Sequence, residues 1–264
     1  MQWWLAYLAI GAAVGFFAGL LGIGGGAVMV PLLVIVFTAQ GLPADHVMHM
    51  ALATSMAAIV FTSVSSMRAH HAHGAVDWGI ARAMAPGILA GAFCAALVAG
   101  LIARRPLALM FTGLVFYAAT QILIDLRPRR SRELPGGLGL FAAGAAIGAV
   151  ASLLAAGGAF LCIPFLAWCR VPLRRAIGTA AAVGLPIAVA GTLGYVVQGL
   201  RMEGLPSLSL GYVYVPALAL VVVTSMAAAP AGARLAHRLP VKRLRVIFAL
   251  LLYALALRML VSLW

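Results

Sequence analysis

The chain has 264 residues, of which 65% are hydrophobic and only 9% are charged. Soluble domains carry about 25% charged residues, so the composition excludes a soluble globular protein. The formal net charge is +13, but the basic residues lie in short segments between apolar runs, where they are expected to set membrane orientation. The charge therefore does not indicate a nucleic-acid partner, and the lipid bilayer is the expected surroundings.

Ten apolar runs are expected to form helices. A helix needs about 20 apolar residues to cross a hydrocarbon core that is ~30 Å thick, and most of the runs approach or exceed this length. Two runs, 26–38 and 158–169, are short, and each directly follows a glycine cluster. The ten runs are 3–21, 26–38, 48–67, 79–103, 106–125, 137–155, 158–169, 176–198, 211–233 and 246–263.

The first glycine cluster lies in "GLLGIGGGAVMVP" at 19–31, which contains five glycines. Because glycine is a poor helix former, we expect the first helix to break here. Broken backbone survives in a membrane only where it is buried in protein or lines a wet cavity. The N–H groups of a restarting helix and its dipole suit an anion. The residues expected to form the breaks and to kink the restarted helices are Gly22, Pro31 and Pro164.

The second half of the chain repeats the first. "GFFAGLLGIGGGAVMVPLLV" (15–34) aligns with "GAVASLLAAGGAFLCIPFLA" (148–167) at a constant offset of 133 residues. "MALATS" (50–55) aligns with "RAIGTA" (175–180), and Pro106 aligns with Pro240. We therefore expect two homologous halves, 1–126 and 137–264, joined by a polar linker at 127–136. A duplicated helical unit that glycine interrupts in both copies is typical of secondary transporters.

The duplicated motifs supply the candidate substrate-binding groups. Glycine clusters also serve close helix packing, hydroxyls also bond their own helix carbonyls, and a buried thiol is commonly inert, so these alternatives stay open. Glycine backbone N–H groups and hydroxyl groups would together bind an anion between the two broken helices. The candidates are Gly24, Gly25, Gly26, Gly157, Gly158, Thr54, Ser55, Thr179 and Cys162.

The acidic residues all lie at or beyond the expected helix ends. A carboxylate in the middle of a span would mark a cation or proton site, and its absence favours an anion as the substrate. The histidines at 70, 71 and 73 lack converging carboxylates, so we expect no metal site there, no cofactor and no enzyme activity. His46 and His49 are interpreted either as interfacial residues or as proton-coupling groups. The acidic residues are Asp45, Asp77, Asp125, Glu133 and Glu203.

The distribution of basic residues distinguishes two topologies. If each half had four full spans, the basic residues would divide almost evenly between the two faces. If the first element of each half is a hairpin, one face collects fourteen basic residues and the other only four, as the positive-inside rule requires. The second arrangement makes an all-α bundle with an inverted repeat, each half being a hairpin plus three transmembrane helices. It predicts periplasmic termini, a cytoplasmic linker, residues 39–47 outside and residues 170–175 inside.

The repeated glycine blocks with their prolines, followed by "ALATS" and "AIGTA", resemble the sulfite exporter TauE/SafE family of bacterial membrane proteins. The resemblance spans both halves and implies an inner-membrane carrier that exports sulfite or a sulfonate such as sulfoacetate. The second block, "AAGGA", lacks counterparts of Gly22 and Gly26. Uptake of thiosulfate or another small anion, and a non-transporting scaffold, are the alternatives. The oligomeric state, including a homodimer, is left open.

Overall fold

The computed structural model describes residues 2–21, 25–124, 133–155, 157–236 and 241–261. Within them, the chain forms ten helices and one short two-stranded hairpin. The first half contributes α1 (Gln2–Leu21), α2 (Gly26–Ala39), α3 (Val47–Ala72), α4 (Trp78–Ala99) and α5 (Arg104–Ile124). The second half contributes α6 (Gly137–Leu153), α7 (Ala159–Trp168), α8 (Leu173–Gly199), β1 (Ser209–Leu210), β2 (Val213–Tyr214), α9 (Val215–Ala236) and α10 (Val241–Val261). The all-helical fold that the apolar runs predict is confirmed.

Five of these helices, α3, α4, α5, α8 and α9, are long and apolar enough to cross a membrane. Helices α2 and α7 are short, as the sequence predicts. The run expected to start at residue 211 is wrong at its beginning, because α9 starts only at Val215. The residues before it form the antiparallel β1–β2 hairpin. Gly211 forms its turn with φ +56° and packs against the backbone of α8 at Val196.

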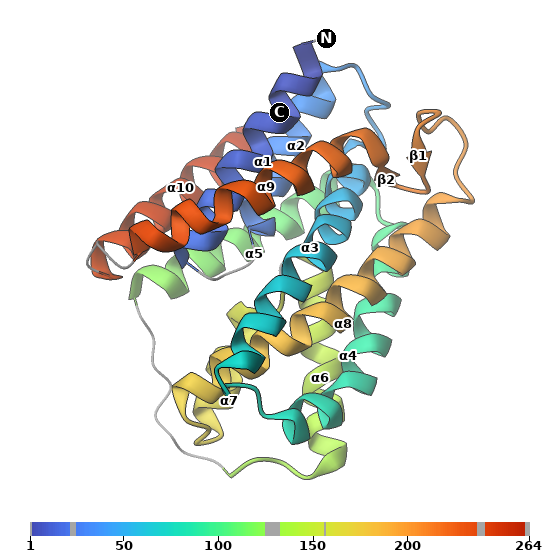
Figure 1. Cartoon of the computed structure of the whole chain (residues 1–264). Helices are drawn as coiled ribbons and strands as arrows, with labels where there is room; N and C mark the ends of the chain where they lie inside the picture. Colours follow the sequence, from blue (N-terminus) through green and yellow to red (C-terminus); the bar gives the residue numbers. More distant parts are fainter. Residues whose placement is uncertain (1, 22–24, 125–132, 156, 237–240, 262–264) are drawn as a thin grey trace.

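The chain path gives the molecule two distinct ends (Figure 1). The N-terminus and the end of α10 lie together at one end, here called the terminal end. The end of α5 and the start of α6 lie away from these termini, on the side of the molecule here called the linker end. Helix α2 lies beside α1 in the part of the molecule nearer the terminal end, whereas α7 lies at the linker end. The two short helices therefore occupy opposite ends of the bundle.

Helices of one half pack along helices of the other. Gly15 on α1 lies so close to Ser225 on α9 that a Cβ at position 15 would overlap the Ser225 backbone. Its aligned residue, Gly148 on α6, lies against the backbone of Ile88 on α4, where a Cβ would be 2.5 Å from the carbonyl oxygen. Small residues permit such close approach between membrane helices. Close packing is thus the role of both glycines.

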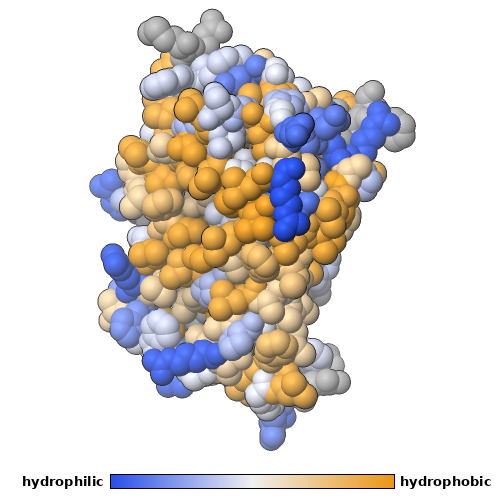
Figure 2. All heavy atoms as spheres, turned by 90° about the vertical axis from the view of Figure 1, so that its right-hand side faces the viewer, coloured by the Kyte–Doolittle hydropathy of each residue, from blue (hydrophilic) through white to orange (hydrophobic). Residues whose placement is uncertain are grey.

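Helix α3 lies at the centre of the bundle. All residues from Val47 to Ile59 are buried, whereas α5 and α10 present large apolar side chains outward. The face shown in Figure 2 is mostly hydrophobic across its middle, with hydrophilic side chains gathered toward its ends and edges. Such a surface fits the lipid bilayer, where outward-facing residues contact hydrocarbon. The chain is a multi-pass membrane protein.

Candidate functional site

Both short helices begin on a glycine in the left-handed conformation. Gly25 precedes α2 with φ +33°, and its aligned residue Gly158 precedes α7 with φ +73°. No side chain caps either helix start. The Gly25 carbonyl accepts from the N–H groups of Val28 and Met29, and the Gly158 carbonyl accepts in the same way from the residues at 161 and 162. The N–H groups of the first residues of each helix precede these bonds and have no acceptor within the helix.

The two breaks in the chain meet inside the bundle. Gly26 lies against the segment that precedes α7, where a Cβ at position 26 would overlap the carbonyl oxygen of Ala155. Ala155 itself has a left-handed backbone, with φ +44°. Gly157 approaches α8, where its carbonyl oxygen would lie 3.0 Å from a Cβ at Gly184. The glycines therefore allow the irregular backbone of both halves to be buried in protein, as a membrane requires.

A cavity of about 470 Å³ lies next to these breaks. Gly25 and Gly157 both line it, together with residues of α1, α2, α3, α7, α8 and α9. From the breaks it extends along α3 to His70 and along α9 to Pro230. Both residues are near the ends of their helices at the linker end of the molecule. The cavity therefore runs from the broken helices toward the linker end.

Hydroxyl groups of α3 form the polar wall of this cavity. Thr62, Ser63, Ser65 and Ser66 all line it. Thr62 donates to the carbonyl of Ile59 on its own helix, but within the described residues the three serine hydroxyls have no hydrogen-bond partner in the protein. These serines were not among the candidates from the sequence. The signal was present in "TSVSS", because positions 62, 63 and 66 lie on one face of a helix.

The cavity carries little charge. Among the described residues that line it there is no aspartate or glutamate, and His70 is the single titratable side chain. The remaining wall is apolar and includes Met29, Ile59 and Ile163. A negatively charged molecule would therefore meet no carboxylate there, and it would find hydroxyl donors on α3 and uncapped backbone N–H groups at the helix starts.

The predicted glycines and prolines occupy several positions relative to the cavity. Gly25 and Gly157 line it. Gly26 packs on Ala155, and a side chain at Gly158 would overlap Ile187. Pro31 and Pro164 lie inside α2 and α7, after the breaks. Gly22 and Gly24 lie outside the described residues.

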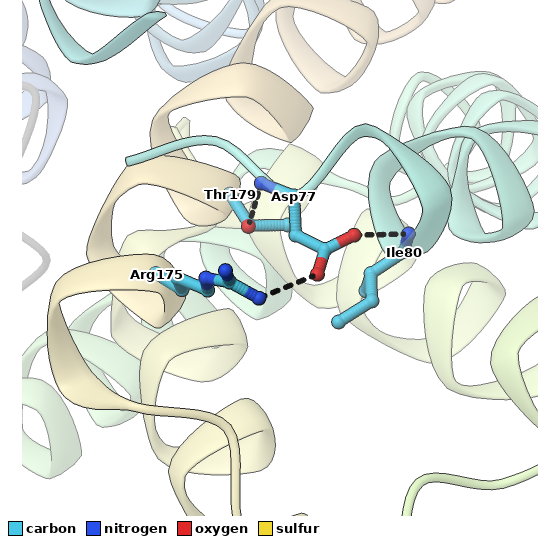
Figure 3. Close-up of polar contacts among 4 residues, drawn as sticks. All are labelled: Asp77, Ile80, Arg175 and Thr179. Atoms are coloured by element: carbon cyan, nitrogen blue, oxygen red, sulfur yellow. Dashed lines mark hydrogen bonds and ion pairs between the residues drawn. The ribbon is translucent and has the colours of Figure 1, made fainter. Parts of the chain in front are cut away.

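The two aligned threonines hold the start of a helix from the other half. Thr179 on α8 accepts a hydrogen bond of 3.0 Å from the backbone N–H of Asp77, the residue before α4 (Figure 3). The Asp77 carboxylate caps α4 by accepting from the N–H of Ile80 at 3.2 Å, and it lies 3.9 Å from Arg175. Thr54 on α3 accepts from Tyr214 in the same way, just before α9. Both threonines are fully buried and lie outside the cavity wall.

Ser55 and Cys162 are also buried and also lie outside the cavity wall. The Ser55 hydroxyl has no hydrogen-bond partner among the described residues. Cys162 is on the first turns of α7, where its N–H donates to the Gly158 carbonyl. The structure therefore brings Gly25 and Gly157 together at the cavity and sets the predicted hydroxyls and thiol apart from it.

At the terminal end, aromatic side chains fill the space between α1, α2 and β2. The rings of Tyr7, Phe37 and Tyr214 contact one another edge to face. Gln40 joins them, because its amide oxygen accepts from the Tyr7 hydroxyl and its amide nitrogen donates to the Tyr214 hydroxyl at 3.4 Å. This group of four residues is called the aromatic closure below.

His49 belongs to the terminal end rather than to the cavity. Its Nε2 contacts the carbonyl oxygens of Ala99 and Ile102 at 3.1 and 3.0 Å, and its ring stacks on Tyr212 with centroids 5.1 Å apart. Burial raises the pKa of the Tyr212 hydroxyl, which lies in the turn of the β-hairpin. His49 therefore connects α3 to the α4–α5 connection and the hairpin.

Two broken helices that meet beside an internal cavity are characteristic of secondary transporters. Residues 7–259 match the sulfite exporter TauE/SafE family, and the chain belongs to this family of membrane transporters. The chain is 35% identical over 257 residues to a probable membrane transporter protein of Haemophilus influenzae, covering 97% of each chain. A probable membrane transporter protein of Methanocaldococcus jannaschii is 24% identical over 260 residues, which cover 96% of this chain and 94% of that one. No solved structure matches the chain significantly.

Proposed function

We propose that the protein exports a small sulfur-containing anion, sulfite or an organosulfonate such as sulfoacetate, across the bacterial inner membrane. The observation that carries the proposal is the cavity beside the two helix starts, which has hydroxyl donors but no carboxylate among its described lining residues. The family name supports the substrate class.

Binding in this cavity would rest on neutral donors. A hydrogen bond to a charged group contributes roughly 1.5–3 kcal/mol, so a few serine hydroxyls and backbone N–H groups can offset much of the cost of dehydrating an anion. The positive ends of α2 and α7 add to this attraction. A site without a fixed cation also releases its anion easily, which suits a carrier.

The basic residues support a cytoplasmic linker end. Arg170, Arg174 and Arg175 precede or begin α8 there, and Arg68, Arg82 and Arg234 lie near helix ends on the same side. Of the basic residues whose side chains the structure describes, Arg104, Arg105, Arg201 and Arg258 belong to the terminal end. By the positive-inside rule, the cavity then extends toward the cytoplasm, where an exporter takes up its substrate. An inside-negative potential favours export of an anion by about 2.3 kcal/mol per charge per 100 mV.

We propose further that residues 1–126 and 137–264 form an inverted repeat. The placement of α2 and α7 at opposite ends supports it, and so do the aligned pairs Gly25 and Gly158, Gly15 and Gly148, and Thr54 and Thr179, each of which has matching contacts or conformation. In such a design the two halves exchange conformations. The aromatic closure would then open as the linker end closes.

Transport by purified protein in proteoliposomes tests the function. Radiolabelled sulfite, sulfoacetate and thiosulfate are offered separately, and we expect uptake of sulfite or sulfoacetate that excess unlabelled substrate abolishes. Gly157→Leu should eliminate this uptake, because the position lines the cavity and a Cβ there meets only Ile59, at 3.7 Å. Gly113→Leu is the matched control, since a Cβ at that exposed position on α5 meets nothing within 4 Å.

The outcomes separate the proposal from its alternatives. Normal transport by Gly157→Leu would contradict the site, and preference for thiosulfate would contradict the substrate. If the wild-type protein neither binds nor transports any of the three anions, the result would favour a non-transporting scaffold role instead.

A further inference from the structure

A second cavity lies on the opposite face of α2 from the first. It has a volume of about 260 Å³ and lies between α2, α5 and α10, near the terminal end. Two arginines line it, Arg104 at the first residue of α5 and Arg258 in the last turn of α10. The other lining residues are Pro31, Val34, Ile35, Thr38, Ala39, Leu255 and Met259.

The two guanidinium groups lack counter-charges in the described part of the chain. Neither Arg104 nor Arg258 has a carboxylate within ion-pair distance there, and neither donates a hydrogen bond to a described residue. Two like charges that line one cavity repel each other, and Arg104 also lies at the positive end of the α5 dipole. An anion bound between them would reduce the repulsion between the two guanidinium groups and the repulsion between Arg104 and the helix dipole. Guanidinium groups bind phosphate through paired hydrogen bonds.

The position of these arginines is unusual for the chain as a whole. Within the described part of the chain, four basic side chains belong to the terminal end, and two of the four line this cavity. Apart from Thr38, the remaining lining residues are apolar, and the neighbouring surfaces of α5 and α10 expose large apolar side chains. Leu101, just before α5, is 74% exposed, and Leu257 on α10 is 55% exposed. A ligand here would be an amphiphile with an anionic head and a hydrocarbon part.

We propose that Arg104 and Arg258 bind the phosphodiester headgroup of an anionic bilayer lipid. Basic pockets between membrane helices on the cytoplasmic side of membranes bind such headgroups, and guanidinium groups bind phosphate in the same way on either side. Here the apolar lining residues of α2 and α10 accommodate the upper part of an acyl chain. The Thr38 hydroxyl, at the same wall, is available to the headgroup oxygens. Because Pro31 of the broken helix α2 lines the site, a bound lipid supports the helix whose start lies at the transport cavity.

The test compares lipids with the same acyl chains but different headgroups. Purified full-length protein in a neutral detergent is titrated with dioleoyl phosphatidylglycerol or dioleoyl phosphatidylcholine, and the thermal unfolding midpoint is followed. We expect the anionic lipid to raise the midpoint of the wild type more than the zwitterionic one does. Arg104→Gln with Arg258→Gln should remove this difference and weaken binding of phosphatidylglycerol at least tenfold.

Arg105→Gln is the matched control, because Arg105 is the exposed neighbour of Arg104 and does not line the cavity. It should keep the full preference for phosphatidylglycerol. Arg104→Lys with Arg258→Lys keeps both charges without the planar fork and should keep part of the preference, which excludes misfolding as the cause of a loss. Titration with glycerol phosphate or with inorganic phosphate, in place of the lipid, distinguishes a lipid site from a site for a free anion.

Three results would overturn the proposal. The first is an unchanged lipid preference in the double glutamine variant. The second is an equal loss in Arg105→Gln, which would mean a diffuse surface charge. The third is stabilisation by inorganic phosphate alone to the same extent as by phosphatidylglycerol, which would mean a free-anion site. None of these depends on which anion the first cavity transports.

Discussion

The hydroxyl oxygen of Thr54 accepts a hydrogen bond of 3.0 Å from the backbone N–H of Tyr214, although the two residues belong to different halves of the chain. The aligned hydroxyl of Thr179 does the same for Asp77, also at 3.0 Å. Each threonine thus satisfies a backbone donor directly before a helix of the other half. A residue that is repeated in both halves can therefore stabilise the junction between them and need not bind the substrate.

Thr54→Val should therefore destabilise the protein. The substitution removes the acceptor and leaves the buried N–H of Tyr214 without a partner, which costs about 1–3 kcal/mol. Thermal unfolding in detergent should show a lower midpoint for Thr54→Val and a near-normal one for Thr54→Ser, which keeps the hydroxyl. Equal midpoints for wild type and Thr54→Val would contradict this role.

Removing hydroxyls from the cavity should weaken substrate binding without affecting the fold. Ser63→Ala with Ser66→Ala deletes two donors, each contributing roughly 1.5–3 kcal/mol to an anion. The transport KM should rise at least tenfold while the unfolding midpoint stays close to that of the wild type. Thr112→Val is the control, because that hydroxyl bonds the carbonyl of Ala108 on its own helix, away from the cavity. Calorimetry with an unchanged Kd for the double variant would exclude these serines from the site.

Cysteine labelling tests the orientation in the membrane. In a background lacking Cys94, Cys162 and Cys169, single cysteines are placed at Ala44 and Leu173, both of which are exposed. An impermeant thiol reagent, applied to intact cells stripped of their outer membrane, should label Ala44→Cys and leave Leu173→Cys unmodified until the cells are lysed. The reverse pattern would invert the orientation, and labelling of both from outside would rule out the inverted repeat.

Weakening the aromatic closure should open the terminal end. Tyr7→Phe with Tyr214→Phe keeps the rings but removes both hydroxyl bonds to Gln40, which lowers the stability of the closed state by ~1 kcal/mol or more. In the same cysteine-free background, a reporter cysteine at Ala181 in the cavity should then react roughly fivefold faster with external reagent. Tyr253→Phe, whose hydroxyl contacts Thr120 between α5 and α10, should leave the rate unchanged. No acceleration in the double variant would mean that another contact holds this end closed.

The helix order and the two breaks could be predicted because they depend on local sequence. A run of apolar residues fixes a membrane helix, and Gly25 and Gly158 take up a backbone conformation that other residues avoid. The contacts of Thr54 and Thr179 could not be predicted, because they join residues more than 100 positions apart. The serines at 63 and 66 were missed for a different reason: they lie a full turn or more beyond the aligned motif, where the repeat offers no comparison. The β-hairpin was missed because its second strand, Val213–Tyr214, continues without a break into the apolar run of α9.

The pairing of α1 with α9 and of α6 with α4 has a consequence for biosynthesis. Gly15 packs against Ser225, which the ribosome adds 210 residues later. At ~5–20 residues per second, the first helix waits roughly 10–40 s for its partner. During that time its glycine face is exposed to lipid or to the insertion machinery. The first half cannot complete its own packing, so a truncated product that ends at the linker should be short-lived in the cell. The exposed glycine face of its unpaired first helix is a feature that cellular quality control can recognise.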